Sequence, residues 1–408
     1  MQKNEQRQLA LFTLKYPYGN SEPFIENEIE VLAKSFSKVF VFPSESDSNK
    51  RPVPQNVYVQ NDLCRIRSGK RHILRVLIKH PFKVIKCFLV ELLGSDSQSY
   101  ITYWKSMLDY LCQDLDKYSR LKRWVSKKSN HNMIFYDYWF LNSAVSLAYL
   151  RKQNHINKLV TRAHGFDLYD DRHLEGAIPF RSFKIKWIDR VYCISKHGQE
   201  YLKSKIDSEY HFKVLLSYMG VKTGTVKAEN SDDDKITIVT CGRVIDFKNI
   251  HKMPEILKKV ACKVKWIHFG DGPLLQEVKL IIPALNSNIE TTLYGDVPNA
   301  TILDFYRNNQ VDLFMSLSKS EGLPISMMEA QMYGIPILAL CVNGVPEIVS
   351  EETGFCIDPK IELSDLAENF AGYLESLHRF DRDAISKRAK ELFDRESNYR
   401  SFCENLKW

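Results

Sequence analysis

The sequence predicts an α/β protein of two doubly wound domains, each a parallel sheet covered by helices. The chain has 408 residues, which exceeds the size of one comfortable hydrophobic core, so two domains are expected. Apolar runs of strand length alternate with helical stretches in both halves, and such alternation indicates parallel sheets. A polar segment at residues 217–234 ends in Ser-Asp-Asp-Asp and reads as a linker. The expected domains are therefore residues 1–216 and 235–382.

The elements expected in each half follow from these apolar runs. In the N-terminal domain, strands are expected at residues 9–14, 39–42, 132–136, 159–163, 191–194 and 213–216, and helices at 23–35 and 140–151. In the C-terminal domain, strands are expected near Ile236, Val264, Ile289, Val311, Ile335 and Gly354, each followed by a helix. Ligands bind at the carboxyl ends of the strands in open α/β sheets, so functional residues are sought there.

Composition limits the class of protein. Hydrophobic content of 44% and charged content of 26% are typical of a soluble globular chain. The N-terminus is polar, and no run approaches the roughly 18 to 20 apolar residues of a spanning helix. The nine cysteines show no C-x-x-C and no paired spacing. This pattern is typical of reduced thiols, so a cytoplasmic protein is expected.

The net charge of +7 is concentrated in one run. Residues Arg65 to Lys86 include eight Lys or Arg and no acid, with Arg71, Arg75 and Lys79 at four-residue spacing among apolar residues. This is a basic amphipathic helix pair that can lie on an anionic membrane surface, or equally a solvated helix face packed normally in its domain. A second basic cluster at residues 120–128 contains Trp124, an aromatic suited to the interface. Nucleic acid fits poorly, because no binding motif is present.

Two carboxylates mark the expected site in the second domain. The apolar run 311–315 reads as a buried strand, and Pro324 suits the first turn of the helix that follows. Glu321 then lies in the loop and Glu329 one to two turns inside the helix. The free N–H groups near residues 323–326 form a natural anion site at the helix start. Such a junction can hold a phosphate at the helix tip and sugar hydroxyls on the carboxylates.

Two cations are expected beside that junction. Gly242 and Arg243 close the first strand of the second domain, and Lys248 follows five residues later. Fixed cations there would neutralise a diphosphate and stabilise it as a leaving group, although both residues also fit an ordinary surface. In the first domain, His164 ends a strand, and Gly19 follows the first strand. His164 suits a hydrogen bond to a sugar or phosphate, or a structural role.

The motifs occur in a characteristic order. They are Tyr16-Pro17 with Gly19, Arg162-Ala-His-Gly-Phe-Asp167, Cys241-Gly-Arg-Val-Ile-Asp-Phe-Lys-Asn249, His268-Phe-Gly-Asp-Gly-Pro273, and the segment with Glu321 and Glu329. This ordered set resembles the retaining glycosyltransferases of family 4, in particular those of capsule and exopolysaccharide biosynthesis. The resemblance implies the GT-B fold, two Rossmann-like domains facing a central cleft. It also implies that the last segment, residues 383–408, crosses back to the first domain.

The resemblance implies a role for each site residue. Arg243 and Lys248 match the cations that bind the donor diphosphate, and the backbone N–H groups of Gly322 and Leu323 would donate to its phosphates. Glu329 matches the residue that grips the ribose, and Glu321 the one that contacts the transferred sugar. His164 matches a histidine that contacts donor sugar or phosphate. Gly19 would let its loop approach the diphosphate, and the segment around Val297 would line the base pocket.

The implied reaction is a retaining transfer from a UDP- or GDP-linked sugar to a glycan or lipid-linked glycan acceptor. The departing diphosphate would deprotonate the acceptor, so no protein nucleophile, metal ion or other cofactor is expected. Two alternatives stay open: another GT-B enzyme, such as a nucleotide-sugar epimerase or a phosphorylase, and a non-enzymatic scaffold on a membrane surface. The chain departs from the family pattern at Asn343, where a glycine is usual; Asn tolerates a left-handed turn.

Overall fold

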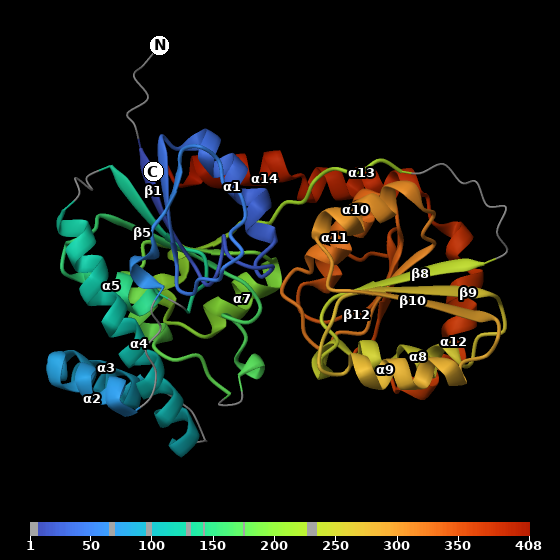
Figure 1. The fold of residues 1–408 in the computed structure, drawn as a ribbon, viewed down its shortest axis with the longest axis horizontal. Helices are drawn as coiled ribbons and strands as arrows, with labels where there is room; N and C mark the ends of the chain where they lie inside the picture. The colour runs from blue at the N-terminus through green and yellow to red at the C-terminus, as the bar shows by residue number, and fades with distance from the viewer. Residues whose placement is uncertain are drawn as a thin grey trace, which may run out of the picture. The chain divides into compact units, whose positions relative to one another are not determined.

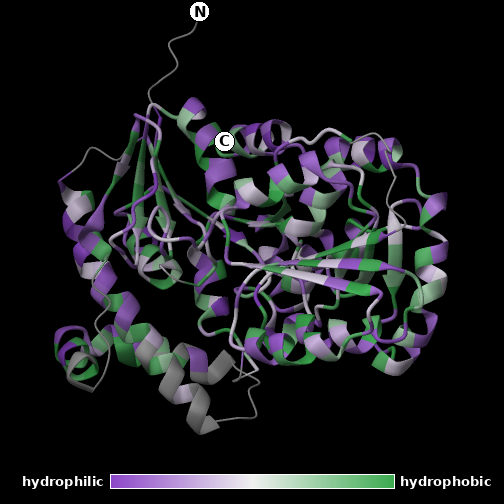
Figure 2. Ribbon diagram, turned by 45° about the vertical axis from the view of Figure 1, so that its right-hand side comes forward, coloured by the Kyte–Doolittle hydropathy of each residue, from purple (hydrophilic) through white to green (hydrophobic). Residues whose placement is uncertain are grey.

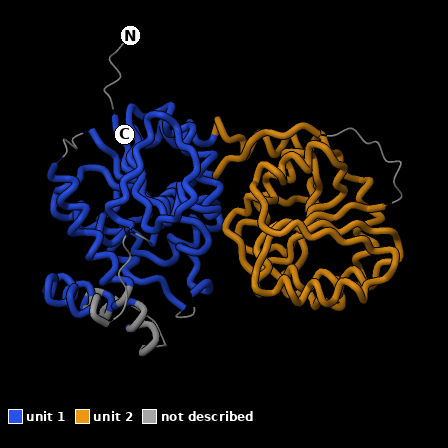
Figure 3. The backbone as a smooth tube through the Cα atoms, in the orientation of Figure 1, with its two compact units in different colours: residues 1–218, 398–408 blue, residues 219–397 orange. Residues whose placement is uncertain are grey.

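The structure is a computed structural model and describes residues 7–64, 70–94, 100–127, 132–141, 143–173, 176–226 and 235–408. It contains two compact units (Figures 1 and 3). Unit 1 comprises residues 1–218 and 398–408, and unit 2 comprises residues 219–397. Each unit has its own parallel sheet, so the predicted pair of doubly wound α/β domains is confirmed.

Unit 1 contains a seven-stranded sheet in the order β3-β2-β1-β4-β5-β6-β7, and every pair of neighbouring strands is parallel. The strands are β1 (Gln8–Thr13), β2 (Lys38–Pro43), β3 (Val57–Val59), β4 (Met133–Asp137), β5 (Lys158–Ala163), β6 (Arg190–Cys193) and β7 (Val214–Leu216). The helices are α1 (Phe24–Ser35), α2 (Lys70–Lys79), α3 (Pro81–Gly94), α4 (Tyr100–Ser126), α5 (Ala144–Lys152), α6 (Arg181–Trp187) and α7 (Lys196–Ser204).

Two hydrophobic cores cover the two faces of this sheet. Successive residues of a strand point to opposite faces, so Leu9 and Leu11 enter one core while Ala10 and Phe12 enter the other. The first core packs against α1 and the last helix of the chain, and the second packs against α4, α5 and α6. Figure 2 shows the strands coloured mainly as hydrophobic, as expected for a parallel sheet buried on both faces.

Unit 2 contains a six-stranded parallel sheet in the order β10-β9-β8-β11-β12-β13. The strands are β8 (Ile236–Cys241), β9 (Val264–Phe269), β10 (Ile289–Gly295), β11 (Leu313–Ser316), β12 (Ile337–Leu340) and β13 (Gly354–Ile357). The helices are α8 (Met253–Leu257), α9 (Leu275–Ile281), α10 (Asn299–Asn308), α11 (Ile325–Met332), α12 (Leu363–Glu375) and α13 (Arg382–Phe393). The strand order reverses between β8 and β11, which is where such sheets bind ligands.

The end of the chain forms α14 (Arg395–Asn405), which begins in unit 2 and continues in unit 1. Its Tyr399 and Phe402 are buried in the core that also contains residues of α1. The expected helix over 383–408 is therefore two helices, separated at Asp394. Val221 pairs with Asp394, and a Cβ on Gly220 would lie 2.5 Å from the Cα of Arg395. Only a glycine fits at residue 220 without moving that backbone.

The expected element positions differ from the structure in a few places. The strand expected at 311–315 begins at Leu313, and the helix expected at 140–151 begins at Ala144. The short edge strand β3 and the long helix α4 were not predicted. β3 has three residues, too few for an apolar pattern to distinguish it from a loop.

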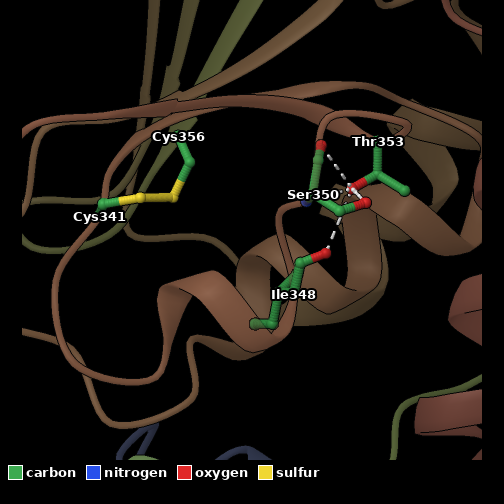
Figure 4. Close-up of a disulfide and its surroundings, with 5 residues drawn as sticks. All are labelled: Cys341, Ile348, Ser350, Thr353 and Cys356. Atoms are coloured by element: carbon green, nitrogen blue, oxygen red, sulfur yellow. Dashed lines mark hydrogen bonds between the residues drawn. A yellow bond between two sulfur atoms is a disulfide. The ribbon is translucent and has the colours of Figure 1, made fainter.

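The expectation that the cysteines are reduced thiols is wrong for one pair. Cys341 and Cys356 are joined in a disulfide with their Cα atoms 5.1 Å apart (Figure 4). Cys341 follows β12, and Cys356 lies in the neighbouring strand β13, so the sheet brings together two residues 15 apart in sequence. Seven other cysteines are free thiols. Sequence spacing did not reveal the pair because strand neighbours are decided by the tertiary fold.

Trp124 also differs from its expected position. Its ring makes edge contacts with Phe40 and Phe42, at centroid distances of 5.4 and 4.9 Å. It therefore packs against the sheet of unit 1 and is not an aromatic at a membrane interface. Among the helices that the structure describes, none combines the length and the apolar character needed to cross a bilayer.

Candidate functional site

The polar residues predicted in unit 2 gather at the carboxyl edge of its sheet. Arg243 follows β8, Glu321 follows β11, and Val297 follows β10, and all these strands are parallel. A pocket at the ends of β8 and β11 is lined by Thr240, Cys241, Lys248, Ser316 and Ser318 among others. The edge therefore combines cations, hydroxyl groups and a carboxylate in one small area.

Lys248 and Glu321 form an ion pair, with Nζ and Oε1 2.5 Å apart. Lys248 ends a short 3₁₀ turn, Asp246–Lys248, and the N–H of Lys319 donates to the carbonyl of Phe247 in the same turn. The side chains are 23% and 9% exposed, so the pair lies partly out of water. An incoming phosphate would compete with Glu321 for the ammonium group of Lys248.

Arg243 lies in the loop after β8 and is exposed. Its guanidinium makes no hydrogen bond or ion pair with the residues that the structure describes. The loop is held against the loop after β9, since a Cβ on Gly270 would lie 2.0 Å from the carbonyl oxygen of Gly242. Gly270 also has φ near +141°, which favours glycine. The predicted tight turn at residues 270–273 thus fixes the backbone that carries Arg243.

The start of α11 provides backbone donors. Pro324 is its N-cap residue, one position before the first helical turn in which it was expected. The N–H groups of Gly322, Leu323, Ile325 and Ser326 donate no hydrogen bond to any residue within the described ranges. Most backbone donors removed from water have a partner, so this group of N–H donors suits an anion.

Glu329 lies in the second turn of α11 and is 4% exposed. Burial raises the pKa of its carboxyl to about 7, and the hydrogen bond from Asn299 and the charge of Lys222 lower it in part. Asn299 Nδ2 donates to Oε1 over 2.9 Å. Within the described part of the chain, no residue donates to the second carboxylate oxygen, so it can accept hydrogen bonds from a bound hydroxyl.

Val297 lies half-buried in the loop between β10 and α10. The ring of Tyr294, just before it, stacks on Phe269 with centroids 4.7 Å apart and is 44% exposed. An exposed ring fixed by stacking offers a flat apolar surface. Asn299, two residues after Val297, holds Glu329, so the start of α10 lies beside the buried carboxylate.

In unit 1, Gly19 lies in the loop after β1 with φ near +59°, and its N–H donates to the carbonyl of Asn49. The loop is organised by Glu22, whose carboxylate accepts hydrogen bonds from the N–H groups of residues 14–16, at 2.6 to 3.1 Å. Trp139 Nε1 donates to the same carboxylate over 2.5 Å. Glu22 thus holds the loop in one conformation.

His164 directly follows β5 and is 6% exposed. Its N–H donates to Asp167 Oδ1 over 2.6 Å, and its ring Nδ1 lies 3.4 Å from Oδ2. The rings of Tyr138 and Trp139 lie against it, with centroids at 4.9 and 4.5 Å. Nε2 is buried and has no hydrogen-bond partner among the residues that the structure describes. The fixed ring leaves this one nitrogen for a ligand.

The structure therefore brings Lys248 into contact with Glu321, and sets Arg243, Gly322, Leu323, Glu329 and Val297 at the same sheet edge. Gly19 and His164 lie at the carboxyl edge of the other sheet, on strands separated by β4. Glu22, Asp167 and Asn299, which position these residues, were not among the predicted site residues. Asp167 was within a recognised motif, three residues after His164, whereas nothing near Glu22 or Asn299 in sequence indicates its partners.

Comparison with known proteins found a family model that matches most of unit 2. Residues 222–392 match the family model described as "Glycosyl transferases group 1". The chain is 27% identical over 174 residues to sulfoquinovosyl transferase SQD2 of Arabidopsis thaliana, a match covering 41% of this chain and 31% of the relative. It is 23% identical over 195 residues to the putative colanic acid biosynthesis glycosyltransferase WcaL of Escherichia coli K12, covering 46% and 48%. The matches span less than half of the length of these two relatives.

Solved structures match over nearly the whole chain. The lipopolysaccharide outer core galactosyltransferase WaaB has a TM-score of 0.68 and 16% identity, covering 98% of both chains. Sucrose-phosphate synthase from Thermosynechococcus elongatus has a TM-score of 0.71 and 15% identity, again covering 98% of both. Anabaena HepE in complex with UDP and glucose has a TM-score of 0.64 and 14% identity, covering 98% and 99%. These likenesses confirm the predicted GT-B fold, and the epimerase, phosphorylase and scaffold alternatives are not favoured by the matches.

Proposed function

We propose that this chain, which resembles GT-B glycosyltransferases and carries a glycosyl transferases group 1 domain at residues 222–392, transfers a sugar from a nucleotide diphosphate donor to a glycan. The names of WcaL and of the teichuronic acid enzyme TuaC support an acceptor in surface polysaccharide biosynthesis. The observation that supports the donor most is the Lys248–Glu321 ion pair beside the N–H donors of α11. The ammonium group of Lys248 and the N–H donors can bind the negative phosphates of a sugar diphosphate.

The diphosphate would bind where cations and N–H groups meet. Arg243 is exposed and unpaired among the described residues, so it reaches a phosphate without losing a protein partner. Lys248 exchanges Glu321 for a phosphate oxygen, and the N–H groups of Gly322 and Leu323 donate to the same group. Donors fixed before the reaction stabilise the negative charge that develops on the leaving diphosphate. Release of Glu321 frees its carboxylate for the hydroxyls of the transferred sugar.

Glu329 would bind the ribose. Its ionised carboxylate has acceptor capacity for two vicinal hydroxyls, and its position is fixed by Asn299. The base would stack near Tyr294 and Val297, on the surface that Phe269 supports. HepE is solved with UDP, which supports UDP as the first donor base to test, with GDP as the second.

We propose a retaining mechanism without a metal ion. His164 Nε2 donates to or accepts from a sugar hydroxyl, and Asp167 fixes the ring that carries it. The nucleotide diphosphate departs from the sugar's reacting carbon, and the acceptor hydroxyl attacks the same face while a departing phosphate oxygen takes its proton. Arg243 and Lys248 supply the positive charge that a metal ion would otherwise provide.

We place the reaction in the cytoplasm, at the inner face of the plasma membrane, where a lipid-linked glycan would be available as acceptor. Seven of the nine cysteines are free thiols, as a reducing cytoplasm favours, and the Cys341–Cys356 disulfide is the exception. Strands β12 and β13 stay adjacent without it, because Cys341 N–H donates to the carbonyl of Ile357 and the ladder register continues through Leu340.

A thermal-shift panel with UDP, GDP, ADP and their common sugars tests the donor. A ligand at about 100 times its dissociation constant adds about 2.7 kcal/mol to native stability, so a true donor raises Tm measurably. We expect one nucleotide to shift the wild type and the control Glu351→Ala, an exposed glutamate of unit 2, but not Glu329→Ala. A shift of equal size in Glu329→Ala would remove Glu329 from the site. No shift with any nucleotide would reject the proposed donor class.

A further inference from the structure

Helices α2 and α3 display large apolar side chains to solvent. Of the described residues 73–91, those that are large, apolar and exposed are Leu74 (60%), Ile78 (74%), Phe82 (85%), Ile85 (56%) and Leu89 (51%). Leu74 and Ile78 are four residues apart on α2, so they lie one above the other on the same helix face. Phe82, Ile85 and Leu89 share one face of α3, because they are three and then four residues apart. Soluble proteins rarely expose so many large apolar residues within so short a segment.

The opposite faces of both helices are packed. Val76 of α2 and Val84 and Cys87 of α3 are at most 4% exposed and belong to the core that contains α4. Lys83 Nζ lies 3.3 Å from the centroid of the Tyr118 ring, which holds α3 on α4. The exposed side chains are therefore held on two helices whose other faces are anchored in unit 1. Each helix already has a buried face, so these apolar side chains are exposed in addition to those that pack in the core.

Basic side chains accompany the exposed apolar residues. Arg75, Lys79 and Lys86 are exposed, and the sequence from residue 65 to residue 90 contains no acid. The first acidic residue, Glu91, is only 8% exposed. Burial lowers the pKa of His80 to about 4, with the positive charges of Lys83 and Lys79 acting in the same direction. The exposed charges that the structure describes on these two helices are therefore all positive.

We propose that α2 and α3 form a docking surface for an anionic lipid bilayer. This α2–α3 surface consists of the apolar residues Leu74, Ile78, Phe82, Ile85 and Leu89 with the basic residues Arg75, Lys79 and Lys86. The apolar side chains enter the interface between headgroups and acyl chains, and the basic side chains contact phosphate groups. Charge complementarity selects this occupant, because the surface offers cations and apolar area and, among its described residues, no exposed acid.

The docking surface deepens the proposed function, and rests on it in one respect: it would hold unit 1 beside a lipid-linked acceptor. Binding to the bilayer itself requires neither donor nor acceptor. It can therefore be measured on the full chain without any sugar, and its failure would leave the donor site untouched. Conversely, binding to vesicles without binding to any nucleotide would support the docking surface and contradict the proposed sugar transfer.

The test is co-sedimentation of the full chain with vesicles of phosphatidylcholine alone, or of equal parts phosphatidylcholine and phosphatidylglycerol. We expect binding to the mixed vesicles only. Phe82→Asp combined with Ile78→Asp should lower the partition coefficient at least about tenfold, because an apolar contact is replaced by a charge that anionic lipid repels. Arg75→Glu with Lys79→Glu should lower it by a similar factor. Phe212→Asp and Leu280→Asp, at residues 75% and 80% exposed outside this surface, serve as controls and should bind like the wild type.

Insertion is tested separately by fluorescence. Phe82→Trp should show a blue-shifted emission on adding the mixed vesicles, whereas Phe212→Trp should not. This variant keeps an aromatic at residue 82, so it remains informative if the aspartate variants fold poorly. Equal binding to both vesicle types, unchanged binding by the charge-reversed variant, or no shift at residue 82 would overturn the proposal. So would a wild-type dimer in sedimentation velocity that Phe82→Asp dissociates, with no vesicle binding, since the occupant would then be a second copy.

Discussion

Polar residues at the carboxyl edges of the two sheets differ in how many hydrogen-bond partners the chain gives them. In unit 1, Glu22 accepts three backbone N–H groups and the indole of Trp139, and Asp167 holds the backbone and ring of His164. In unit 2, Arg243 and the N–H groups before α11 have no partner among the described residues, and Glu329 is buried with one amide donor. The carboxylates of Glu22 and Asp167 in unit 1 are thus held in internal hydrogen bonds. In the described part of unit 2, Lys248 and Glu321 are paired with each other, whereas Arg243 and these N–H groups stay available.

This difference predicts how each unit responds to a ligand. A loop fixed by four hydrogen bonds loses little entropy when it meets a ligand, so the loop that contains Gly19 is preorganised. Unsatisfied donors and a buried carboxylate cost stability in the absence of ligand and are compensated when a ligand supplies the missing partners. The donor is therefore expected to contribute more stability to unit 2 than to unit 1.

The largest expected effect tests a buried ion pair of unit 1. Arg162 and Glu28 are both 0% exposed and form an ion pair of 3.4 Å, with Tyr136 donating to Glu28. Arg162→Met should lower the free energy of unfolding by about 3 to 5 kcal/mol, because Glu28 is left buried without its cation. Equilibrium unfolding in urea measures this loss of stability.

The double variant Arg162→Met with Glu28→Met is the control for that prediction. It should recover most of the loss, since no buried charge remains. A single variant as stable as the wild type would show that Arg162 does not compensate the buried charge of Glu28.

The second effect tests the open site of unit 2. Glu329 has an ordinary pKa of 4.5, which burial raises to about 7 in the folded chain. The folded state therefore retains a proton that the unfolded state releases, and stability falls as pH rises between these two values. Glu329→Gln removes this cost, so it should raise the free energy of unfolding at pH 8 by about 3 kcal/mol at most, with little change near pH 4.

The same substitution should weaken the donor. A neutral amide accepts fewer hydrogen bonds than a carboxylate, so nucleotide affinity should fall while stability rises. Unfolding at both pH values and a nucleotide titration on one preparation measure the two effects. A loss of stability at pH 8 would contradict the assigned burial cost.

The third effect concerns the ion pair between Lys248 and Glu321. Lys248→Ala should lower turnover at least about tenfold, or roughly 1.4 kcal/mol, because the leaving diphosphate loses a cation. Lys252→Ala, which removes an exposed lysine paired with Glu255, is the matched control and should keep wild-type turnover. Initial rates with a saturating donor distinguish the two. Wild-type turnover in Lys248→Ala would remove this residue from the diphosphate site.

The smallest effect is on the pH dependence of binding. If the ionised carboxylate of Glu329 binds the ribose, nucleotide affinity should rise severalfold as pH increases through about 7, where this group loses its proton. Isothermal titration at several pH values would detect the change. Glu329→Gln should flatten the profile, and a wild-type profile that is already flat would assign the ribose contact to another residue.

Local patterns in the sequence were sufficient to predict the fold class and most of the strands. Apolar runs of strand length predicted twelve of the thirteen strands found in the described residues, within a few positions, since a strand buried on both faces is recognisable from a continuous apolar run. The motif around Glu321 and Glu329 predicted the strand, loop and helix that carry these carboxylates. The basic run at residues 65–86 predicted a helix pair, although it did not show which apolar residues face the core.

The sequence by itself determined the element order, the fold class and the residue types at the strand ends, because each depends on neighbours within a few positions. Only the tertiary structure decided that Lys248 pairs with Glu321, that Asn299 holds Glu329, and that Glu22 organises the loop containing Gly19. It also decided that Cys341 meets Cys356, and that Phe82 is exposed while Val84 is buried. Such pairings and exposures arise from strand order and helix packing, which bring distant residues together and leave no local pattern in the chain.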